Sequence, residues 1–190
     1  MFRPMPKPQK KDKKKMTAYE FRKKYAGKKI GAAGKSHKPP RKKKIYDTTA
    51  WIWFSRYIKL LYSDKQGMVK CQTSGHPMSI SSRNLHCGHC IKVYDGNSTN
   101  MNVALDERNC MPQSYQENHY FGGRPEIMAR LIDQTHGEGT YDELLRLSKI
   151  PKFYTDNELK DIAYKYKMKT YELLKEKNIK KWWTKRKSRK

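Results

Sequence analysis

Hydrophobic residues recur at helical spacing directly after residue 47. Four large apolar side chains lie three or four positions apart and so fall on one face of a helix: Trp51, Phe54, Ile58 and Leu61. Asp47 or Thr48 is suited to cap the first turn, because its side-chain oxygen can accept a free backbone N–H. The pattern predicts a helix over about residues 48–62. We expect it to dock on the domain core, a use that we favour over stacking on bases.

The apolar pattern between residues 67 and 120 is shorter and is interrupted by turn residues. It first predicts three features in succession: a strand over 68–71, a turn over 73–77 and a returning strand over 78–80. A second strand pair is expected within 84–93. Residues 95–98 are predicted to be a loop, because Asp, Gly, Asn and Ser favour turns. A loop and a short helix over 106–120 complete this unit.

Helical periodicity returns after residue 123. The apolar positions are Ile127, Met128, Leu131 and Ile132 in a first helix, Leu144, Leu145 and Leu147 in a second, and Leu159, Ile162, Ala163, Tyr166, Leu173 and Leu174 in a third. Pro125 suits the first turn of the first helix, and Pro151 separates the last two. Thr155 and Glu158 have the spacing of a capping box at the start of the third. We interpret these helices as scaffold.

The positive charge of the chain is concentrated at its two ends. The net charge is +25, from 43 Lys and Arg against 18 Asp and Glu. Residues 1–44 hold 18 of the basic and 2 of the acidic residues, and residues 175–190 hold 9 and 1. Residues between these ends are nearly neutral, with 16 and 15. The sequence therefore predicts a near-neutral domain between two basic arms. The first arm is expected to be largely disordered, with a short helix over 17–26.

Basic arms around a neutral domain indicate a nucleic-acid partner, because Lys and Arg beside phosphates release condensed counterions. Arms that only aid solubility are a weaker alternative. An anionic membrane is a weaker third option, since neither arm has an amphipathic apolar face. The candidate DNA-contacting residues are Lys42, Lys43, Lys44, Arg56, Lys59, Trp182, Trp183, Lys185, Arg186 and Lys187. The two tryptophans could stack on bases or pack on the domain, and the sequence favours neither use.

The four cysteines are expected to be reduced thiols or metal ligands: Cys71, Cys87, Cys90 and Cys110. The chain opens on a segment rich in Lys and Pro rather than on an apolar leader, and it has no long apolar run. A reducing cytoplasm is therefore the predicted location, where disulfides are rare.

Histidine and asparagine side chains between residues 85 and 123 follow the order of groups in a one-metal phosphodiesterase. They are His86, His89, Asn109, Asn118 and His119. A neutral imidazole can take a proton from water. A second imidazole or an amide oxygen can hold a divalent cation, and the cation stabilises charge on a phosphate.

This stretch resembles the HNH nuclease core and, more narrowly, the NinG (Rap) family of phage recombination proteins. That family reads Asp-Ala-Gly-His-Phe at a first site, where residues 86–90 here are His-Cys-Gly-His-Cys. At a second site the family reads Asn-x-His-Pro-Gln-Cys-x-x-Cys-Asn, followed by Gly-Gly. Here that site runs from Asn109-Cys110-Met111-Pro112-Gln113 to Asn118, with Gly122-Gly123 in place. The resemblance extends from about residue 50 to the last helix and leaves the basic ends uncovered.

The resemblance implies an α+β fold with a small ββα-metal finger, flanked by an N-terminal helix and a C-terminal helical region. The expected divisions are 1–44 for the basic arm, 45–123 for the HNH-like core with its leading helix, 124–178 for the helical region and 179–190 for the basic tail. The implied function is DNA recombination in the cytoplasm of a bacterial host, by metal-dependent endonuclease action on branched DNA such as Holliday junctions. A homodimer is one arrangement that this function allows.

The resemblance also implies roles for single residues. His89 matches the general base, and Asn109 matches an amide that braces the loop behind that base. The cation would be held by His86 with Asn118 or His119. Mg²⁺ or Mn²⁺ is expected. Because His86 replaces the Asp of the family, Zn²⁺ and Ni²⁺ are alternatives. That replacement leaves open a second function, a non-catalytic protein derived from the HNH fold that binds branched or single-stranded DNA.

Many members of the family carry two Cys-x-x-Cys pairs whose four thiolates would hold a structural zinc. The matching positions here are residues 71–74 and 114–117, and of these four thiols only Cys71 is present. We therefore expect no structural zinc, and expect burial by the flanking helices in its place. Cys87 and Cys90 have the spacing of such a pair, but their use would consume the strand that carries the first site.

Overall fold

The computed structural model describes residues 44–95 and 98–183. The chain divides into two units, residues 1–41 and 42–190, and the described residues all belong to the second. The helix predicted over 17–26 lies outside the described residues, as do residues 1–43 of the first basic arm and residues 184–190 of the second.

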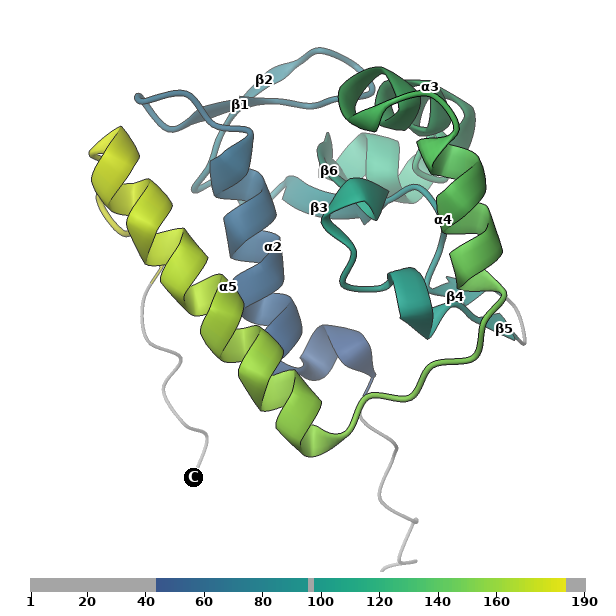
Figure 1. Cartoon of the computed structure of the whole chain (residues 1–190). Coiled ribbons are helices and arrows are strands. Elements are labelled where there is room, and N and C mark those ends of the chain that lie inside the picture. The colour runs from purple at the N-terminus through teal and green to yellow at the C-terminus, as the bar shows by residue number, and fades with distance from the viewer. Residues whose placement is uncertain (1–43, 96–97, 184–190) are drawn as a thin grey trace, which may run out of the picture. The chain divides into compact units, whose positions relative to one another are not determined.

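Helices and short strands alternate along the described residues (Figure 1), and the predicted α+β class is confirmed. The helical elements are η1 (Ile45–Asp47), α2 (Thr49–Leu61), η2 (Met101–Val103), η3 (Glu107–Asn109), η4 (Gln116–Tyr120), α3 (Pro125–His136), α4 (Thr140–Ser148) and α5 (Asp156–Lys177). The strands are β1 (Met68–Lys70), β2 (Pro77–Ser79), β3 (Leu85–His89), β4 (Tyr94–Asp95), β5 (Ser98–Thr99) and β6 (Cys110–Ser114). They form three two-stranded antiparallel sheets, β1–β2, β3–β6 and β4–β5.

The caps predicted for the long helices are present. Thr48 Oγ1 accepts the backbone N–H of Trp51 at 3.2 Å at the start of α2. Thr155 and Glu158 form a reciprocal capping box at the start of α5, and Pro125 lies in the first turn of α3. These side chains satisfy N–H groups that have no partner inside the helix, and so fix where each helix begins.

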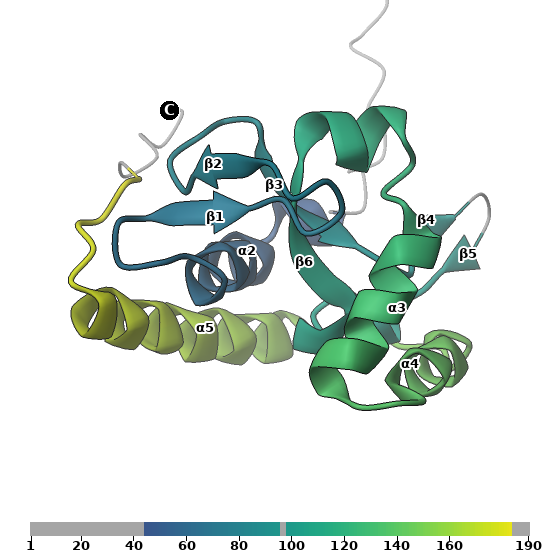
Figure 2. The same cartoon turned by 90° about the horizontal axis from the view of Figure 1, so that it is seen from above.

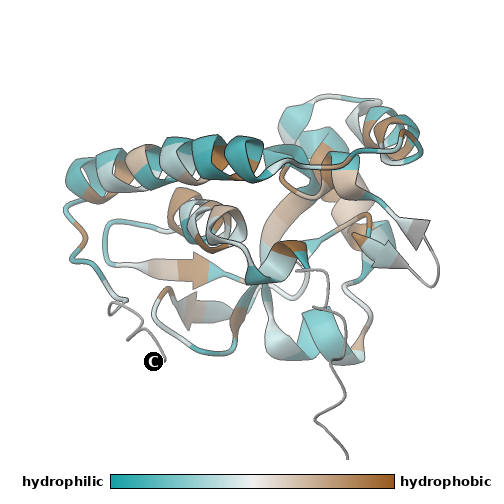
Figure 3. Cartoon of the chain, turned by 90° about the horizontal axis from the view of Figure 1, so that it is seen from below, coloured by the Kyte–Doolittle hydropathy of each residue, from teal (hydrophilic) through white to brown (hydrophobic). Residues whose placement is uncertain are grey.

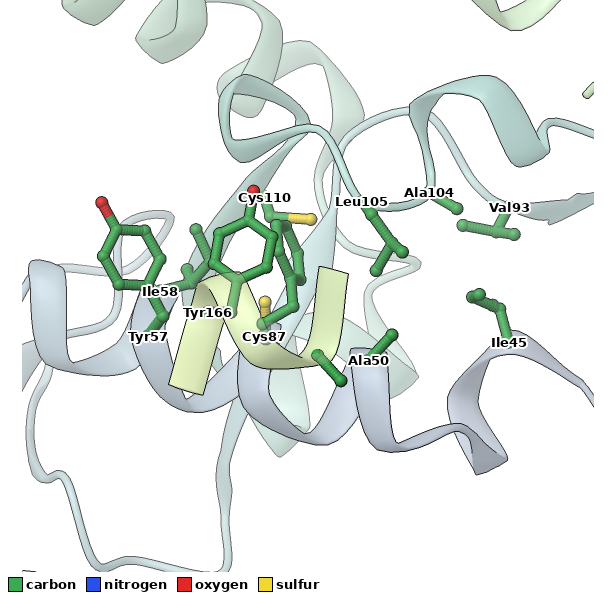
Figure 4. Close-up of a cluster of buried hydrophobic side chains, with 12 residues drawn as sticks. Ile45, Ala50, Tyr57, Ile58, Cys87, Val93, Ala104, Leu105, Cys110 and Tyr166 are labelled. Carbon is green, nitrogen blue, oxygen red and sulfur yellow. The ribbon is translucent and has the colours of Figure 1, made fainter. Parts of the chain in front are cut away.

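Helix α5 runs alongside α2 in both views (Figures 1 and 2). The ring of Phe54 on α2 meets the ring of Tyr166 on α5 edge to face, with centroids 4.9 Å apart. Figure 4 shows that Tyr166 approaches the same core as Cys87 of β3 and Cys110 of β6. Helix α5 is the more hydrophilic of the two helices (Figure 3). Its buried residues form a single stripe: Ala163, Tyr166, Thr170 and Leu174. The pair therefore supplies one wall of the core, with β3 and β6 behind it.

The central sheet differs from the prediction. A strand pair was expected within residues 84–93, but this segment contains only β3, which pairs with β6 about twenty residues later (Cys87↔Pro112, His89↔Cys110). The missed strand has no polar and apolar alternation, because its first four residues are all buried. It also contains Pro112, which is disfavoured in a strand interior. The long connection from β3 to β6 carries β4, β5, η2 and η3.

Helices α3 and α4 cover a second hydrophobic cluster beside the central sheet. Met128, Ile132 and Leu144 are fully buried there against Val103 and Met111. Within the described residues, no helix has both the length and the apolar surface that a membrane span would need.

The C-terminal ends of α2 and α5 lie together and share one ammonium group. Lys177 Nζ, in the last turn of α5, donates to the carbonyl oxygens of Leu60 and Ser63 at 2.7 Å and of Leu61 at 3.0 Å. Two parallel helices place their partly negative ends side by side, and a cation there opposes that repulsion. Lys177 therefore uses all three of its donors to hold α5 against α2.

We expect Lys177→Met to lower the free energy of unfolding by about 1–3 kcal/mol, because carbonyls that now accept from a charged donor would lose their partner. Urea unfolding followed by circular dichroism measures this loss. Lys175→Met is the matched control, since Lys175 is exposed in the same turn of α5. Equal losses in the two variants would contradict the assignment.

Candidate functional site

A cavity of about 570 Å³ lies where β3, α2 and η4 meet. The residues that line it include His86, His89 and Asn118, which the sequence singled out. Aromatic rings form part of its wall and cationic side chains another part: Tyr46, Trp51 and Tyr94, and Lys59, Arg83 and Lys92. Imidazole, amide and cationic groups therefore converge on one space that is large enough for a small ligand.

His89 is the last residue of β3, and its ring is fixed from two sides. The indole of Trp51 stacks on it with centroids 5.0 Å apart and planes 19° apart. Its Nε2 lies 2.9 Å from the carbonyl oxygen of Ala104. A carbonyl oxygen can only accept, so Nε2 carries the proton and Nδ1 keeps its lone pair. The ring therefore has one basic nitrogen that makes no hydrogen bond of its own within the described structure.

The same surroundings keep His89 neutral. Part of its surface opens to the cavity, but protein encloses the rest of the ring. This burial lowers the pKa of His89 from 6.5 to about 4, and the hydrogen bond to Ala104 only partly opposes the shift. At neutral pH the imidazole is unprotonated and able to accept a proton. An anion bound beside it would raise the pKa again, because it favours the imidazolium form.

Asn109 is fully buried and braces the connection behind His89. Its Oδ1 accepts the backbone N–H of Ile91 at 2.8 Å, and its Nδ2 donates to the carbonyls of Ile91 and Val103, both at 3.1 Å. The bracing that we predicted for this amide is therefore present. Since Ala104 directly follows Val103, the amide also positions the carbonyl that orients His89.

The residues before Asn109 tie the same loop to two helices. Glu107 accepts from Lys169 and from the Tyr166 hydroxyl of α5. Arg108 donates to both oxygens of Asp106 and to Glu143 of α4, at 3.1 Å for the latter. The loop that presents the Ala104 carbonyl is thus held by α4 and α5 and by its own buried amide.

His86 and Asn118 contact each other directly across the cavity. Asn118 Nδ2 donates to His86 Nδ1 at 3.2 Å. The pKa of His86 is lowered, mainly by burial and then by the neighbouring Lys59 and His119. Two ligands of one octahedral cation are about 3 Å apart, and a carboxamide that turns over presents its oxygen in place of its nitrogen. The pair therefore fits two positions of a divalent cation. Its imidazole suits Mn²⁺, Ni²⁺ or Zn²⁺ better than Mg²⁺.

His119 does not join this pair. Its ring is exposed and stacks on Tyr115, with centroids 5.0 Å apart, and it does not line the cavity. Of the two alternatives predicted beside His86, Asn118 is therefore the one in contact. Within the described residues no group of three or more His, Cys, Asp and Glu side chains converges on one point.

Gln113 holds η4 against the sheet, a role that sequence reasoning missed. It is fully buried, and its Nε2 donates to the carbonyl of Gly123 at 2.7 Å and to Thr73 Oγ1 at 3.3 Å. Its Oε1 is buried without a hydrogen-bond partner and lies directly against Gly88 of β3. A Cβ on Gly88 would overlap this oxygen and lie 3.2 Å from Asn118 Oδ1. Gly88 is needed because the amide of Gln113 occupies the space of a side chain.

Hydrogen bonds around the sulfur of Cys71 link residues 71–74 to residues 114–117. Cys71 Sγ accepts the backbone N–H of Ser114 at 3.2 Å and lies 3.5 Å from Thr73 Oγ1. Ser114 Oγ accepts the N–H of Glu117 at 3.1 Å. Burial raises the pKa of Cys71, but hydrogen bonds from Ser74, Thr73 and Ser114 outweigh it, and the net pKa is lowered.

The other three cysteines are buried as free thiols. Cys87 and Cys110 lie in the main hydrophobic core. Cys90 lies in the second cluster, where its Sγ approaches the carbonyl of Pro125 at 3.5 Å. Burial raises the pKa of Cys90 to about 12 and that of Cys110 well above 9. Cys90 and Cys110 therefore stay protonated at neutral pH.

The predicted DNA-contacting residues fall into four groups. Lys59 lines the cavity, and burial lowers its pKa. Arg56 instead lies between the rings of Trp53 and Trp183, 4.9 and 4.6 Å from their centroids, and Trp182 packs on a third hydrophobic cluster. For the two tryptophans the structure thus favours packing over exposure to bases. Lys44 lies near the ring of Tyr94. Lys42, Lys43, Lys185, Arg186 and Lys187 lie outside the described residues.

No family model, curated protein or solved structure matches this chain.

We expect the pKa of His89 in the folded protein to be about 4, measured by following its ring carbon-bound protons by NMR. Unfolded His89 titrates at about 6.5, so the unfolded state binds more protons between these values. The contribution of His89 to the free energy of unfolding is complete above about pH 6.5 and falls, by about 3 kcal/mol at most, as the pH drops to about 4. His89→Gln should lack this part of the pH dependence. An unshifted pKa would contradict the enclosed ring.

We expect Gly88→Ala to destabilise the protein by about 1–3 kcal/mol, because its new methyl group overlaps the Gln113 amide. Gln113→Ala should also be destabilising, since it removes the bond to Gly123 and leaves a gap. The double variant should lose less than the two single losses together, because the methyl group fills the gap. Urea unfolding of the four proteins measures this coupling. Additive losses would show that the two residues do not share the space.

Proposed function

We propose that this chain is a metal-dependent DNA endonuclease of the HNH type that hydrolyses phosphodiester bonds. The observation that carries the proposal is the state of His89: a neutral imidazole whose Nε2–H is held by Ala104 and whose basic Nδ1 is left for a reactant. It lines one cavity together with His86, Asn118 and Lys59. The order β3, β6 and η4 also agrees with the strand, strand and helix of a ββα finger.

The chemistry that these groups support is in-line hydrolysis. His89 Nδ1 takes a proton from a water molecule as the water oxygen bonds to phosphorus. The bond from phosphorus to the 3′ oxygen breaks, and the leaving oxygen takes a proton from solvent, giving a 5′-phosphate and a 3′-hydroxyl. The imidazolium that forms is favoured by the anionic phosphate and returns its proton to water.

His86 and Asn118 would hold the divalent cation, and such a cation would stabilise the negative charge that builds on the phosphate. Lys59 adds a positive charge from α2 on the same cavity. Its burial disfavours an isolated ammonium group, and an entering phosphate would give this lysine an ion pair that no described residue supplies. These groups would bind the phosphate and not the edges of the bases, so we expect little preference for DNA sequence.

We further propose that the substrate is branched DNA, as the NinG resemblance implies, and that the protein acts in recombination. The basic arms, with 27 of the 43 Lys and Arg, would supply salt-sensitive affinity for the backbone. The alternative is a non-catalytic DNA-binding protein of the same fold, which needs the arms but not the neutral His89.

A synthetic four-way junction, incubated with the full chain and Mn²⁺, Mg²⁺, Ni²⁺ or Zn²⁺, separates these functions. We expect nicks with 5′-phosphate ends, and a loss of about 10²- to 10⁴-fold in cleavage rate for His89→Ala with retained gel shift. His76→Ala is the control, since His76 is exposed outside the cavity. A gel shift without nicks under every metal would contradict catalysis and support the binding protein.

A further inference from the structure

Short helix η4 and its two flanking residues carry four aromatic side chains beside the cavity, here called the aromatic patch: Tyr115, His119, Tyr120 and Phe121. The rings of the first three contact one another. Tyr115 stacks on His119, with centroids 5.0 Å and planes 16° apart. Tyr120 lies edge to face with both, 5.7 and 5.2 Å away. The N–H of Phe121 donates to the carbonyl oxygen of Gln116, five residues earlier, so η4 has a wider turn than an α-helix. This turn places both His119 and Tyr120 beside Tyr115.

The aromatic patch faces solvent rather than the protein interior. The exposed fraction is 71% for Tyr120, 44% for Phe121 and 38% for Tyr115. None of its members belongs to a hydrophobic cluster formed by the described residues. Single exposed aromatic residues are ordinary, but a contiguous group of them is typical of a binding surface.

The backbone after η4 holds the aromatic patch in place. Gly122, Gly123 and Arg124 all have positive φ, of 66°, 86° and 49°. For a residue with a Cβ, such as Arg124, this conformation costs about 1 kcal/mol or more, so the surroundings must enforce it. Arg124 is held by an ion pair with Glu117 at 3.3 Å, and its guanidinium lies over the ring of Phe121. Gln113 Nε2 holds Gly123 by donating to its carbonyl oxygen.

The aromatic patch is continuous with the candidate site. The ring of Tyr115 meets that of His86 edge to face, with centroids 5.2 Å apart. Asn118, on the same short helix, contacts His86 inside the cavity. If a phosphate of a DNA strand occupied the cavity, the neighbouring sugar and base of that strand would therefore lie over the aromatic patch.

We propose that the aromatic patch stacks on unpaired nucleobases adjacent to the phosphate in the cavity, so that the site takes DNA with unpaired nucleotides in preference to continuous duplex. The inference rests on the proposed function in taking nucleic acid as the ligand. Bases in a duplex already have both faces covered by their neighbours, and exposing one costs a few kcal/mol. A single strand or the branch point of a junction offers a free face without that cost. Aromatic stacking of this kind tolerates any base.

Equilibrium binding of the full chain to three labelled DNAs tests this inference. The ligands are a single strand, a forked duplex with 2-aminopurine at the fork and a blunt duplex of equal length, all in EDTA so that nothing is cleaved. For Tyr120→Ala we expect the single strand and the fork to bind about 5- to 100-fold more weakly, and the blunt duplex to be nearly unaffected. Quenching of 2-aminopurine should fall with the same variant.

The matched controls keep the test sharp. Tyr164→Ala removes a tyrosine of similar exposure, 66%, from α5 and should change none of the three affinities. Tyr120→Trp should keep the preference for unpaired DNA. Equal weakening for all three DNAs, or none for any, would overturn the proposal. So would a shift in the monomer–dimer equilibrium of Tyr120→Ala with unchanged DNA preference, since the aromatic patch would then bind a second copy of the chain. Because nothing is cleaved, the preference can stand even if the nuclease assignment fails.

Discussion

The geometry of the candidate site depends on the need to satisfy one buried amide. Asn109 is excluded from water, so its oxygen and nitrogen must find partners inside the protein, and they find them on Ile91 and Val103. These three bonds bring three distant points of the connection between β3 and β6 together. Ala104 is held beside Val103 as a consequence, and its carbonyl selects which nitrogen of His89 carries the proton. A packing requirement at one residue thus decides the chemistry available at another.

The helices that flank the sheet act on the site through the residues just before Asn109. Glu107 is bound by α5, and Arg108 joins Asp106 to α4. These neighbouring side chains point to different elements, so the loop cannot shift without breaking contacts on both sides. The C-terminal helices are therefore more than a cover for the hydrophobic clusters, because they set the position of the connection that orients His89.

Features set by local chemistry could be predicted from the sequence, and those set by pairing at a distance could not. The start of α5 followed from Thr155 and Glu158, and the face of α2 followed from its spacing. Strand β6 was not predicted, because its first four residues are all buried and include Pro112. Gly88 and Gln113 showed no signal for their contact, which exists only in the register that the β3–β6 pairing creates. Likewise, Lys177 gave no sign that it would join two helix ends.

Prediction of the site had the same limits. The grouping of His86, His89 and Asn118 followed from their order and from the family resemblance, and all three line one cavity. The sequence did not decide between Asn118 and His119, because the choice depends on the wide turn of η4. It suggested Arg56 as a phosphate contact but gave no sign of the rings of Trp53 and Trp183, whose centroids lie 4.9 and 4.6 Å from its guanidinium. The Trp183 contact comes from a residue 127 positions later, which periodicity cannot reveal.

The length of the connection between β3 and β6 has a consequence for how the protein folds. Closing about twenty residues costs more chain entropy than forming a tight hairpin, and the gain comes only once both strands and the amide of Asn109 are in place. Helices α2 and α5 can form early from their own caps, whereas the strand pair needs the whole connection to condense at once. In newly made or partly folded chains, His89 would therefore acquire its oriented, neutral state only after the two helices have formed, as a late step of maturation.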